Sequence, residues 1–358
     1  MRFYSSDCAS FGKLVYSART TKFDHHKAAV DHFDASVRLC FNTFSGIQTS
    51  DTHWARANLA TSAGGLGLRS VSKHSAAAYL ASRSACHSLC KDLDPSHMWE
   101  VEDAASSAAA AVTHVNGLVA PSDAVPPAVP DRLQQKTISK AIDSASLSSL
   151  SANADASCRA HLSLQQKKGA GSCFVKPPTE NTHSQVDPQL FRGMLCRRLR
   201  VPFVDSPFYC PFCDGVSDIY GDHALVCSGG GDRTKRHNLL RNCCATYAAR
   251  AGLNPEVEKP GLLRPRPLVG ARPECGSDSG PHGSVARRPA DVYIPRLGIS
   301  GPTALDFAVT SGLRTSMLAS SAANPSAAVN SYADTKRAHL STAQHCQEEG
   351  RQLHSDVR

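Results

Sequence analysis

Aromatic residues and long apolar runs are scarce in this chain. Aromatic residues make up only 6% of its 358 residues. No run approaches the roughly eighteen apolar residues that a membrane-spanning helix needs, so we expect no membrane partner. The opening residues MRFYSSDCASFGKLVYSAR also lack the apolar core of a secretory signal peptide. The fourteen cysteines are therefore expected to be reduced and not to form a disulfide framework. Those expected to be small buried side chains are Cys86, Cys90, Cys243 and Cys244.

Acidic residues are outnumbered by basic ones. The chain carries 39 Lys and Arg against 31 Asp and Glu, a net charge of +8. This balance favours a polyanionic partner, although an ordinary soluble basic protein has the same balance. The length predicts two or three domains, and a hydrophobic content of 41% is enough for a real core.

Residues 1–95 are predicted to be globular and helical. The stretch DHHKAAVDHFDASVRLCFNTF repeats apolar residues at steps of three and four, as one face of an amphipathic helix does. Farther on, Gly64, Gly65 and Gly67 separate a short helix from a long Ala-rich one. A phosphate-binding loop is the alternative. No strand precedes GGLGL and no Lys-Ser or Lys-Thr pair follows it, which favours a turn.

Residues 96–185 change in composition. AASSAAAAV, PSDAVPPAVP and SASLSSLSANADAS are rich in Ala, Ser and Pro and poor in large apolar residues. Such a segment buries too little apolar surface to offset the entropy lost on ordering. We therefore expect a disordered linker with transient helix. The alternative is that the Ala runs form a real helix.

A compact helix is predicted in DPQLFRGMLCRRLRVP, within a third segment at residues 186–232. Its leucines and methionine face a core, while its arginines, Arg197 and Arg198 among them, point outward. These arginines are either an ordinary solvated face or contacts to nucleic-acid phosphates.

The most specific motif in the same segment is CPFCDGVSDIYGDHALVC. Its potential metal ligands, spaced Cys-x2-Cys-x9-His-x3-Cys, are Cys210, Cys213, His223 and Cys227. Thiolate and imidazole are preferred ligands of Zn²⁺, and four of them close a tetrahedron with no open position. We therefore predict a structural zinc site, a zinc knuckle, in which Gly215 and Gly221 let the loop fold back.

Basic residues follow the knuckle at once in DRTKRHNLLRN. They indicate nucleic-acid backbone contact at the start of a helix. His237 is a reserve zinc ligand, but its place favours a phosphate or water contact. The predicted nucleic-acid contacts are Arg197, Arg198, Arg233, Lys235, Arg236, His237 and Arg241. The predicted buried stripe of this helix is Leu239, Leu240, Cys243, Tyr247 and Ala251.

Two carboxylates stand on predicted strands in the last segment, residues 233–358. RPADVYIP and ALDFAVT alternate apolar and polar residues, which predicts half-buried strands, and LGISGP supplies a turn between them. This strand-turn-strand brings Asp291 and Asp306 together. Two carboxylates make a hard oxygen site that suits Mg²⁺, which can activate water against a phosphodiester. Glu258, or else Glu256, is expected to supply a third oxygen.

In combination, these blocks resemble a known family. GKLVYSAR, FDASVRLCF, WARANLATSAGGLGLRS and HSAAAYLAS are similar to the thumb region behind the polymerase core of non-LTR retrotransposon reverse transcriptases. GDHALVC, RTKRHN, RPADV and LDFAVTSGLR resemble the zinc knuckle and the PD-(D/E)xK restriction-like endonuclease of site-specific elements. The resemblance covers residues 187–346 and, as thumb, 1–95. No Tyr-x-Asp-Asp motif occurs in the chain, so we expect no polymerase active site and no DNA synthesis.

The sequence departs from the nuclease pattern at several points. Its Pro-Asp is interrupted as Pro-Ala-Asp at residues 289–291, and the Lys expected two residues after Asp306 is Ala308. The resemblance implies a Lys displaced to a downstream helix, for which SYADTKRAH offers Lys336. A Lys there orients or deprotonates the attacking water and offsets phosphate charge; the alternative is an ordinary solvated side chain. The resemblance also implies that the domain continues past Arg358.

The predicted fold class is a multi-domain α+β protein. Its predicted parts are a helical thumb-like segment, a disordered Ala/Ser/Pro linker, a zinc knuckle and an α/β restriction-endonuclease-like domain, at residues 1–95, 96–185, 186–232 and 233–358. The resemblance implies a Mg²⁺-dependent endonuclease, with structural Zn²⁺, that nicks target DNA for target-primed reverse transcription. Its implied partners are the DNA target and the element RNA, in the nucleus, with no small-molecule substrate. The implied catalytic residues are Asp291, Asp306, Lys336 and Glu258. The alternative is a catalytically inactive, zinc-dependent nucleic-acid-binding remnant.

Overall fold

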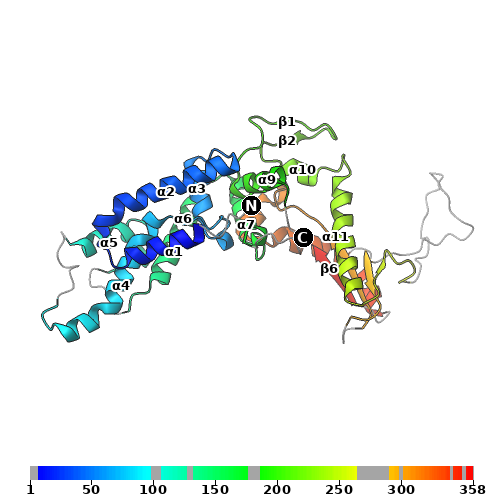
Figure 1. Ribbon diagram of the computed structural model, residues 1–358. Helices are drawn as coiled ribbons and strands as arrows, with labels where there is room; N and C mark the ends of the chain where they lie inside the picture. Colours follow the sequence, from blue (N-terminus) through cyan, green and yellow to red (C-terminus); the bar gives the residue numbers. More distant parts are fainter. Residues whose placement is uncertain are drawn as a thin grey trace, which may run out of the picture. The chain divides into compact units, whose positions relative to one another are not determined.

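The computed structural model describes residues 7–97, 106–126, 132–175, 186–263, 290–297, 301–338, 342–348 and 352–357. The chain divides into two compact units, Met1–Asp205 and Ser206–Arg358. The first unit is helical, and the second combines helices with two small sheets (Figure 1). The α+β class predicted from the sequence is confirmed at this coarse level. Within the described ranges, no helix has the length and apolar character to cross a bilayer.

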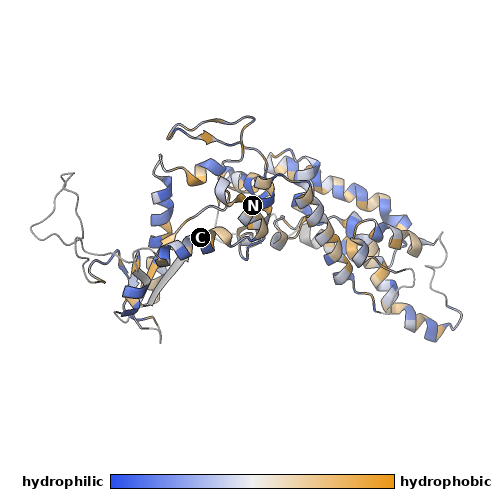
Figure 2. Ribbon diagram, turned by 180° about the vertical axis from the view of Figure 1, so that it is seen from behind, coloured by the Kyte–Doolittle hydropathy of each residue, from blue (hydrophilic) through white to orange (hydrophobic). Residues whose placement is uncertain are grey.

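The N-terminal unit is built from helices joined by turns. Its α-helices are α1 (Asp7–Ala18), α2 (Phe23–Ser45), α3 (Asp51–Asn58), α4 (Val71–Leu93), α5 (Ser107–Asn116), α6 (Gln135–Ala152), α7 (Ala156–Gln165), α8 (Ser172–Val175) and α9 (Pro188–Leu199). Its short 3-10 turns are η1 (Thr61–Ala63) and η3 (Pro121–Asp123). The long helices carry hydrophilic and hydrophobic residues together (Figure 2), and burial of their hydrophobic faces holds them together.

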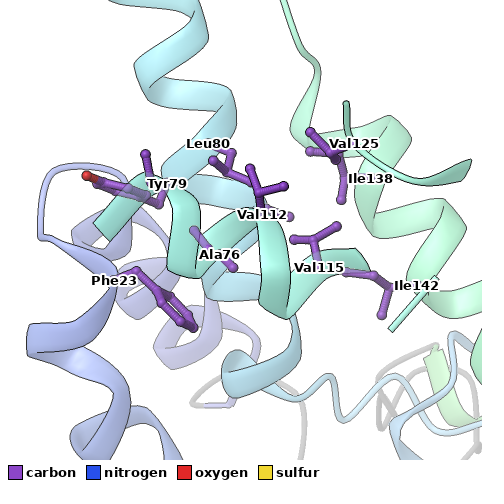
Figure 3. Close-up of a cluster of buried hydrophobic side chains, with 12 residues drawn as sticks. Phe23, Ala76, Tyr79, Leu80, Val112, Val115, Val125, Ile138 and Ile142 are labelled. Carbon is purple, nitrogen blue, oxygen red and sulfur yellow. The ribbon is translucent and has the colours of Figure 1, made fainter. Parts of the chain in front are cut away.

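The described helices of the segment predicted to be a disordered linker, α5 and α6 among them, are part of this helical core. Figure 3 shows Val112 and Val115 of α5 and Ile138 and Ile142 of α6 gathered around Leu80 of α4. All five side chains are at most 8% exposed. The linker prediction was wrong because small apolar residues let helices approach closely, so that a few Val and Ile bury completely. The alternative of a real helix holds for this segment.

Helix α9 also belongs to the N-terminal unit, not to the knuckle. Its Leu195 and Leu199 are buried against Phe41 and Ile47, close to the C-terminus of α2. The predicted segment boundary at residue 186 therefore lies inside a compact unit, and the division falls after residue 205.

Arg198 of α9 is a buried cross-link, contrary to the prediction that it points outward to phosphates. Its side chain is among the most buried in the chain, and the residue is 2% exposed. Its guanidinium donates to the carbonyl oxygens of Thr61 at 2.5 Å and of Gly65 at 3.0 Å and 3.1 Å. It also donates to the carbonyl oxygen of Gln165 at 3.3 Å. The charge is used to hold three backbone segments together, and the neighbouring Arg197 is half-buried.

The glycine-rich stretch is a turn, as predicted, and not a phosphate loop. Gly64 and Gly67 have φ of +94° and +76°, where a side chain is disfavoured. The amide of Gly65 donates to the carbonyl of Ala60 at 3.1 Å, and that of Gly67 donates to Leu59 at 2.8 Å. These amides therefore already have acceptors within the protein, which leaves them unsuited to cradle a phosphate.

The C-terminal unit begins with a hairpin and ends with a mixed sheet. Its strands are β1 (Phe208–Tyr209), β2 (Val216–Ser217), β3 (Glu256–Val257), β4 (Val292–Ile294), β5 (Thr303–Ala308) and β6 (Gln352–Val357). Its helices are α10 (Asp222–Val226), α11 (Asp232–Arg250), η6 (Thr315–Met317), α12 (Leu318–Ala323), α13 (Ala327–Ala338) and α14 (Thr342–Glu348). The larger sheet has the order β3-β4-β5-β6, with only β5 and β6 parallel. A parallel pair needs a long crossover, which here contains α12, α13 and α14.

Helix α11 packs on this sheet through a different face than the sequence predicted. Leu240, Cys244 and Ala248 join the sheet core, whereas Leu239 and Tyr247 are 68% and 65% exposed. Consecutive residues of a helix point about 100° apart. Because apolar residues stand next to each other in this helix, the sequence is compatible with two different apolar faces. The contact with the sheet selects one of them. The cysteines predicted to be buried are partly or fully exposed: Cys86, Cys90, Cys243 and Cys244.

Strand β5 is covered on both faces, not on one as its alternation predicts. Phe307 packs in the cluster with α11, and Ala308 packs against Ala333 of α13. The two β5 residues are 3% and 6% exposed. The second cover comes from the crossover to β6, because a parallel connection places helices over the sheet.

The Arg198 cross-link yields a stability prediction for the N-terminal unit. Arg198→Met keeps the aliphatic stem of the side chain but removes the guanidinium donors from the buried carbonyl oxygen of Gly65, so it should lower the free energy of unfolding by about 3 kcal/mol. Both tryptophans, Trp54 and Trp99, lie in this unit, so urea unfolding followed by Trp fluorescence measures it. The matched control is Arg192→Met on the exposed side of the same helix, for which we expect a loss within about 1 kcal/mol. Equal losses would contradict the assignment.

Candidate functional site

The four predicted zinc ligands converge in the C-terminal unit. The ligand atoms of Cys210, Cys213, His223 and Cys227 all lie within 4.8 Å of one another. Cys227 Sγ is 3.7 Å from Sγ of both Cys210 and Cys213, and Cys213 Sγ is 3.4 Å from His223 Nε2. Four ligands around Zn²⁺ with Zn–S bonds of about 2.3 Å have S–S edges of about 3.8 Å, whereas a disulfide needs about 2.05 Å. The donor set and its spacing fit a tetrahedral zinc ion.

Two short elements position these ligands. Cys210 and Cys213 lie in the turn between β1 and β2, where the amide of Cys210 donates to the carbonyl of Gly215 at 2.9 Å. His223 lies in α10, and Cys227 follows its end. A Cβ on Gly215 would stand 2.7 Å from Cε1 of the His223 ring. Glycine is therefore required there by close approach, which supports the predicted folding back of the loop.

The thiol of Cys210 has a lowered pKa, which favours the thiolate form. The backbone N–H of Phe212, with hydrogen bonds from His223 and the other two thiols, lowers the pKa of Cys210 to about 6. The thiolate is the form that ligates a metal and it predominates at neutral pH.

Asp218 holds the histidine ligand in place, a role that the sequence reasoning missed. Its carboxylate accepts from the amides of His223 at 2.7 Å, Tyr220 at 2.8 Å and Asp222 at 3.1 Å. Burial raises the pKa of Asp218, but these amides together bring it below its ordinary value. The available signal was an Asp shortly before a Gly-Asp-His helix start, where such side chains bond to free amides.

The basic residues behind the knuckle differ in their exposure. Arg233 and Lys235 are exposed in the first turn of α11, where Lys235 forms an exposed ion pair with Asp232 at 3.2 Å. Arg236 donates to a knuckle carbonyl, that of residue 225, at 2.5 Å. Arg241 forms an ion pair with Glu258. Of these four, Arg233 and Lys235 therefore suit the predicted phosphate contact, whereas Arg236 and Arg241 serve contacts within the unit.

The β4–β5 hairpin brings the two predicted carboxylates together. Val292 pairs with Leu305, and the amide of Asp291 donates to the carbonyl of Leu305 at 2.9 Å. This register sets Asp291 beside Asp306, close enough for Asp291 to raise the pKa of the Asp306 carboxyl. Both side chains are 16% exposed. Pro289, the first residue of the predicted Pro-Ala-Asp, lies outside the described residues.

Both oxygens of Asp291 are engaged. Oδ1 lies 3.1 Å from Nε2 of His237 in α11, and Oδ2 accepts from the amide of Phe307 at 2.6 Å. His237 was predicted as a phosphate or water contact with a reserve role at the zinc. Its observed partner is Asp291 instead, because the face of α11 that packs on the sheet includes His237.

Lys336 of α13 reaches the same cluster. Its Nζ lies 3.1 Å from both oxygens of Asp306. Burial raises the pKa of Asp306, the Lys336 ammonium lowers it and the nearby Asp291 raises it again, and the net result is a raised pKa. The Lys336 suggested by resemblance is therefore in contact with the acidic pair and not a solvated side chain.

Among the described residues, the predicted third carboxylate is not grouped with the acidic pair, although Glu258 lies beside it and donates its amide to the carbonyl of Asp291 at 2.9 Å. Glu258 pairs with Arg241, and Glu256 pairs with Lys259 at 2.6 Å. Across the described part of the chain, the Cys/His group is the only cluster of three or more close potential ligands. The prediction for Glu258 is corrected on this ground, since the arginine competes for its carboxylate.

Comparisons with protein-family models, with curated proteins and with solved structures found no match to this chain.

The zinc assignment predicts a specific loss of metal. Cys213→Ser removes one thiolate, so the bound zinc should fall from about one equivalent per chain to near zero, and the region around the knuckle should unfold. Elemental analysis of the purified protein measures the metal. The control is Cys243→Ser, which alters an exposed thiol on α11 outside the cluster. Unchanged zinc in Cys213→Ser would reject the site.

The raised pKa of Asp306 predicts a pH dependence with a definite sign. The folded state holds this proton more tightly than the unfolded chain, so stability falls as pH rises from the ordinary carboxyl pKa through the raised one. Asp306→Asn should lack this fall. Pulse proteolysis in urea between about pH 4 and pH 7 measures the difference between the two proteins, in which other titrations cancel. A stability of the parent that rises relative to Asp306→Asn over this range would contradict the expectation.

Proposed function

We propose that the C-terminal unit is a metal-dependent DNA endonuclease and that the chain is the C-terminal part of a non-LTR retrotransposon polyprotein. The observation that carries the proposal is the convergence of Asp291, next to β4, Asp306 of β5 and Lys336 of α13. Two carboxylates and one ammonium at a partly buried place are the groups that hydrolysis of a phosphodiester needs. In this proposal the nick primes reverse transcription by a polymerase elsewhere in the element.

The acidic pair fits a divalent cation by its chemistry. Burial raises the pKa of Asp306, and the neighbouring Asp291 raises it further although Lys336 opposes both; a divalent cation held by these oxygens would offset the repulsion between the two carboxylates. Bound there, Mg²⁺ would polarise a phosphodiester and lower the pKa of a water. With the carboxylate of Glu258 paired with Arg241, the protein would supply two carboxylates, which agrees with the preference of Mg²⁺ for few protein ligands besides water and phosphate.

The chain's own residues do the rest of the work in this mechanism. Lys336 contacts both oxygens of Asp306, so it favours the ionised carboxylate. An ammonium has three donors, which leaves one for a phosphate oxygen or a water. The buried position of the pair excludes bulk water and strengthens each of these interactions.

The zinc cluster fits a structural role beside the nuclease. Four protein ligands leave no position for substrate, and Arg236 ties the start of α11 to the knuckle. Zinc would therefore fix the helix turn that carries the exposed Arg233 and Lys235. These two side chains suit sequence-independent phosphate contact.

The N-terminal unit is proposed to be the thumb-like part of the same polyprotein. Its support is its helical build and the GGLGL turn that joins α3 to α4. The DNA target and the element RNA are the proposed partners, with the nucleus as the proposed location.

A catalytically inactive, zinc-dependent nucleic-acid-binding remnant is the second candidate. The observation that favours it is the pairing of Glu258 with Arg241, which leaves the acidic pair without a third carboxylate. The exposed basic turn of α11 serves binding equally well in both cases.

A plasmid-nicking assay with Mg²⁺ tests the proposal. The parent chain should convert supercoiled plasmid to open circles, and Asp306→Ala should slow this by about a hundredfold or more. Glu256→Ala is the matched control, since it removes a carboxylate that lies outside the cluster, and it should nick at the parent rate. Gel-shift measurements report DNA binding separately. A parent chain that binds DNA without nicking it would reject the enzyme in favour of the second candidate.

A further inference from the structure

His237 is a residue of the acidic cluster that the nuclease pattern does not include. It lies in the first turns of α11, and its Nε2 is 3.1 Å from Oδ1 of Asp291 although the two residues are 54 positions apart. The other oxygen of Asp291 accepts from the amide of Phe307 at 2.6 Å. Each oxygen of this carboxylate therefore has its own partner, one from a helix and one from a strand.

The packing of α11 fixes where this imidazole stands. His237, Leu240 and Cys244 are spaced three and four residues apart, so they lie on one face of the helix. Leu240 and Cys244 pack in the core cluster with Val292 of β4. His237 thus extends the buried face by one turn, toward the end of β4 where Asp291 stands.

We propose that His237 is a positioning residue that orients Asp291 as a ligand for the divalent cation, an inference that rests on the proposed nuclease function. An Asp side chain rotates about two bonds, and a carboxylate with partners on both oxygens is restricted to one orientation. The amide of Phe307 fixes Oδ2, and the imidazole of His237 fixes Oδ1. Partners of this kind behind a metal ligand commonly change metal affinity by about 10-fold to 100-fold.

Two amide variants separate this role from simple packing. His237→Gln places its side-chain nitrogen close to the position of Nε2 and keeps a donor for Asp291. His237→Asn carries the same amide one carbon shorter, so its nitrogen falls near the position of Nδ1 and loses that contact. Both variants are neutral and polar, and zinc content and thermal unfolding of each show that the unit is folded.

The measurements are Mn²⁺ affinity by electron paramagnetic resonance on the zinc-loaded full chain, single-turnover nicking rate, and DNA affinity. We expect His237→Asn to bind Mn²⁺ about 10-fold to 100-fold more weakly and to nick correspondingly more slowly, with unchanged DNA affinity. His237→Gln should stay within about threefold of the parent in all three.

The possible results divide cleanly. A His237→Asn variant that keeps parental Mn²⁺ affinity and nicking would overturn the role of His237 alone. So would equal losses in the two variants, or a loss of DNA affinity with unchanged Mn²⁺ affinity, which would return His237 to the phosphate contact expected from the sequence. A parent chain that neither binds Mn²⁺ nor nicks DNA would overturn the nuclease proposal, and this inference with it.

Discussion

The register between β4 and β5 is the constraint on which the C-terminal unit depends. Val292 pairs with Leu305. Because the strands are antiparallel, Asp291, the residue before Val292, lies beside Asp306, the residue after Leu305. Sliding β5 by a single residue would exchange its two faces, so the slip would place Asp306 in the apolar cluster around Phe307. The burial of Val292 and Phe307 against α11 forbids that. The same strand register therefore determines both the packing of the core and the proximity of Asp291 and Asp306.

The same unit gathers acidic groups at two places, where they repel one another when both are ionised. Three thiols stand within 4.8 Å of one another in the knuckle, and two carboxyl groups meet at the hairpin. Soft donors fit zinc at the first place, and at the second the hard oxygens are the ligands of the proposed Mg²⁺. At the hairpin the protein offsets part of the repulsion itself, through Lys336 and the imidazole of His237. Perturbed carboxyl groups held by residues from separate elements are typical of functional sites.

Local patterns in the sequence were enough for part of this structure. The knuckle ligands span a short stretch, so their spacing determined the cluster, and the alternation around Asp291 and Asp306 was enough for the hairpin. Contacts between residues distant in sequence could not be predicted from these local patterns, because residue spacing carries no information on which face of a helix packs on a sheet. The contact of His237 with Asp291 depends on the phase of α11, where adjacent apolar residues offered two stripes. The prediction for Arg198 was wrong for the same reason: an arginine on a solvent-exposed basic face and an arginine buried among carbonyl oxygens have the same local sequence. The prediction of a disordered linker was wrong because amino-acid composition measures how much apolar surface a segment has and not how closely its small residues pack.

The distribution of charge indicates which part of the C-terminal unit would contact a nucleic acid under the proposed function. Residues 206–231 contain no Lys or Arg but include several Asp, and bound thiolates add negative charge, so the knuckle itself repels a phosphate backbone. Attraction has to come from its neighbour, the first turn of α11, where Arg233 and Lys235 are exposed. Arg236 joins that turn to the knuckle through a carbonyl, and His237, the next residue, reaches the acidic pair. Under the proposed function, zinc would therefore act on DNA indirectly: it would hold the start of α11, where Lys235, a proposed phosphate contact, and His237, the proposed partner that orients Asp291, are two residues apart.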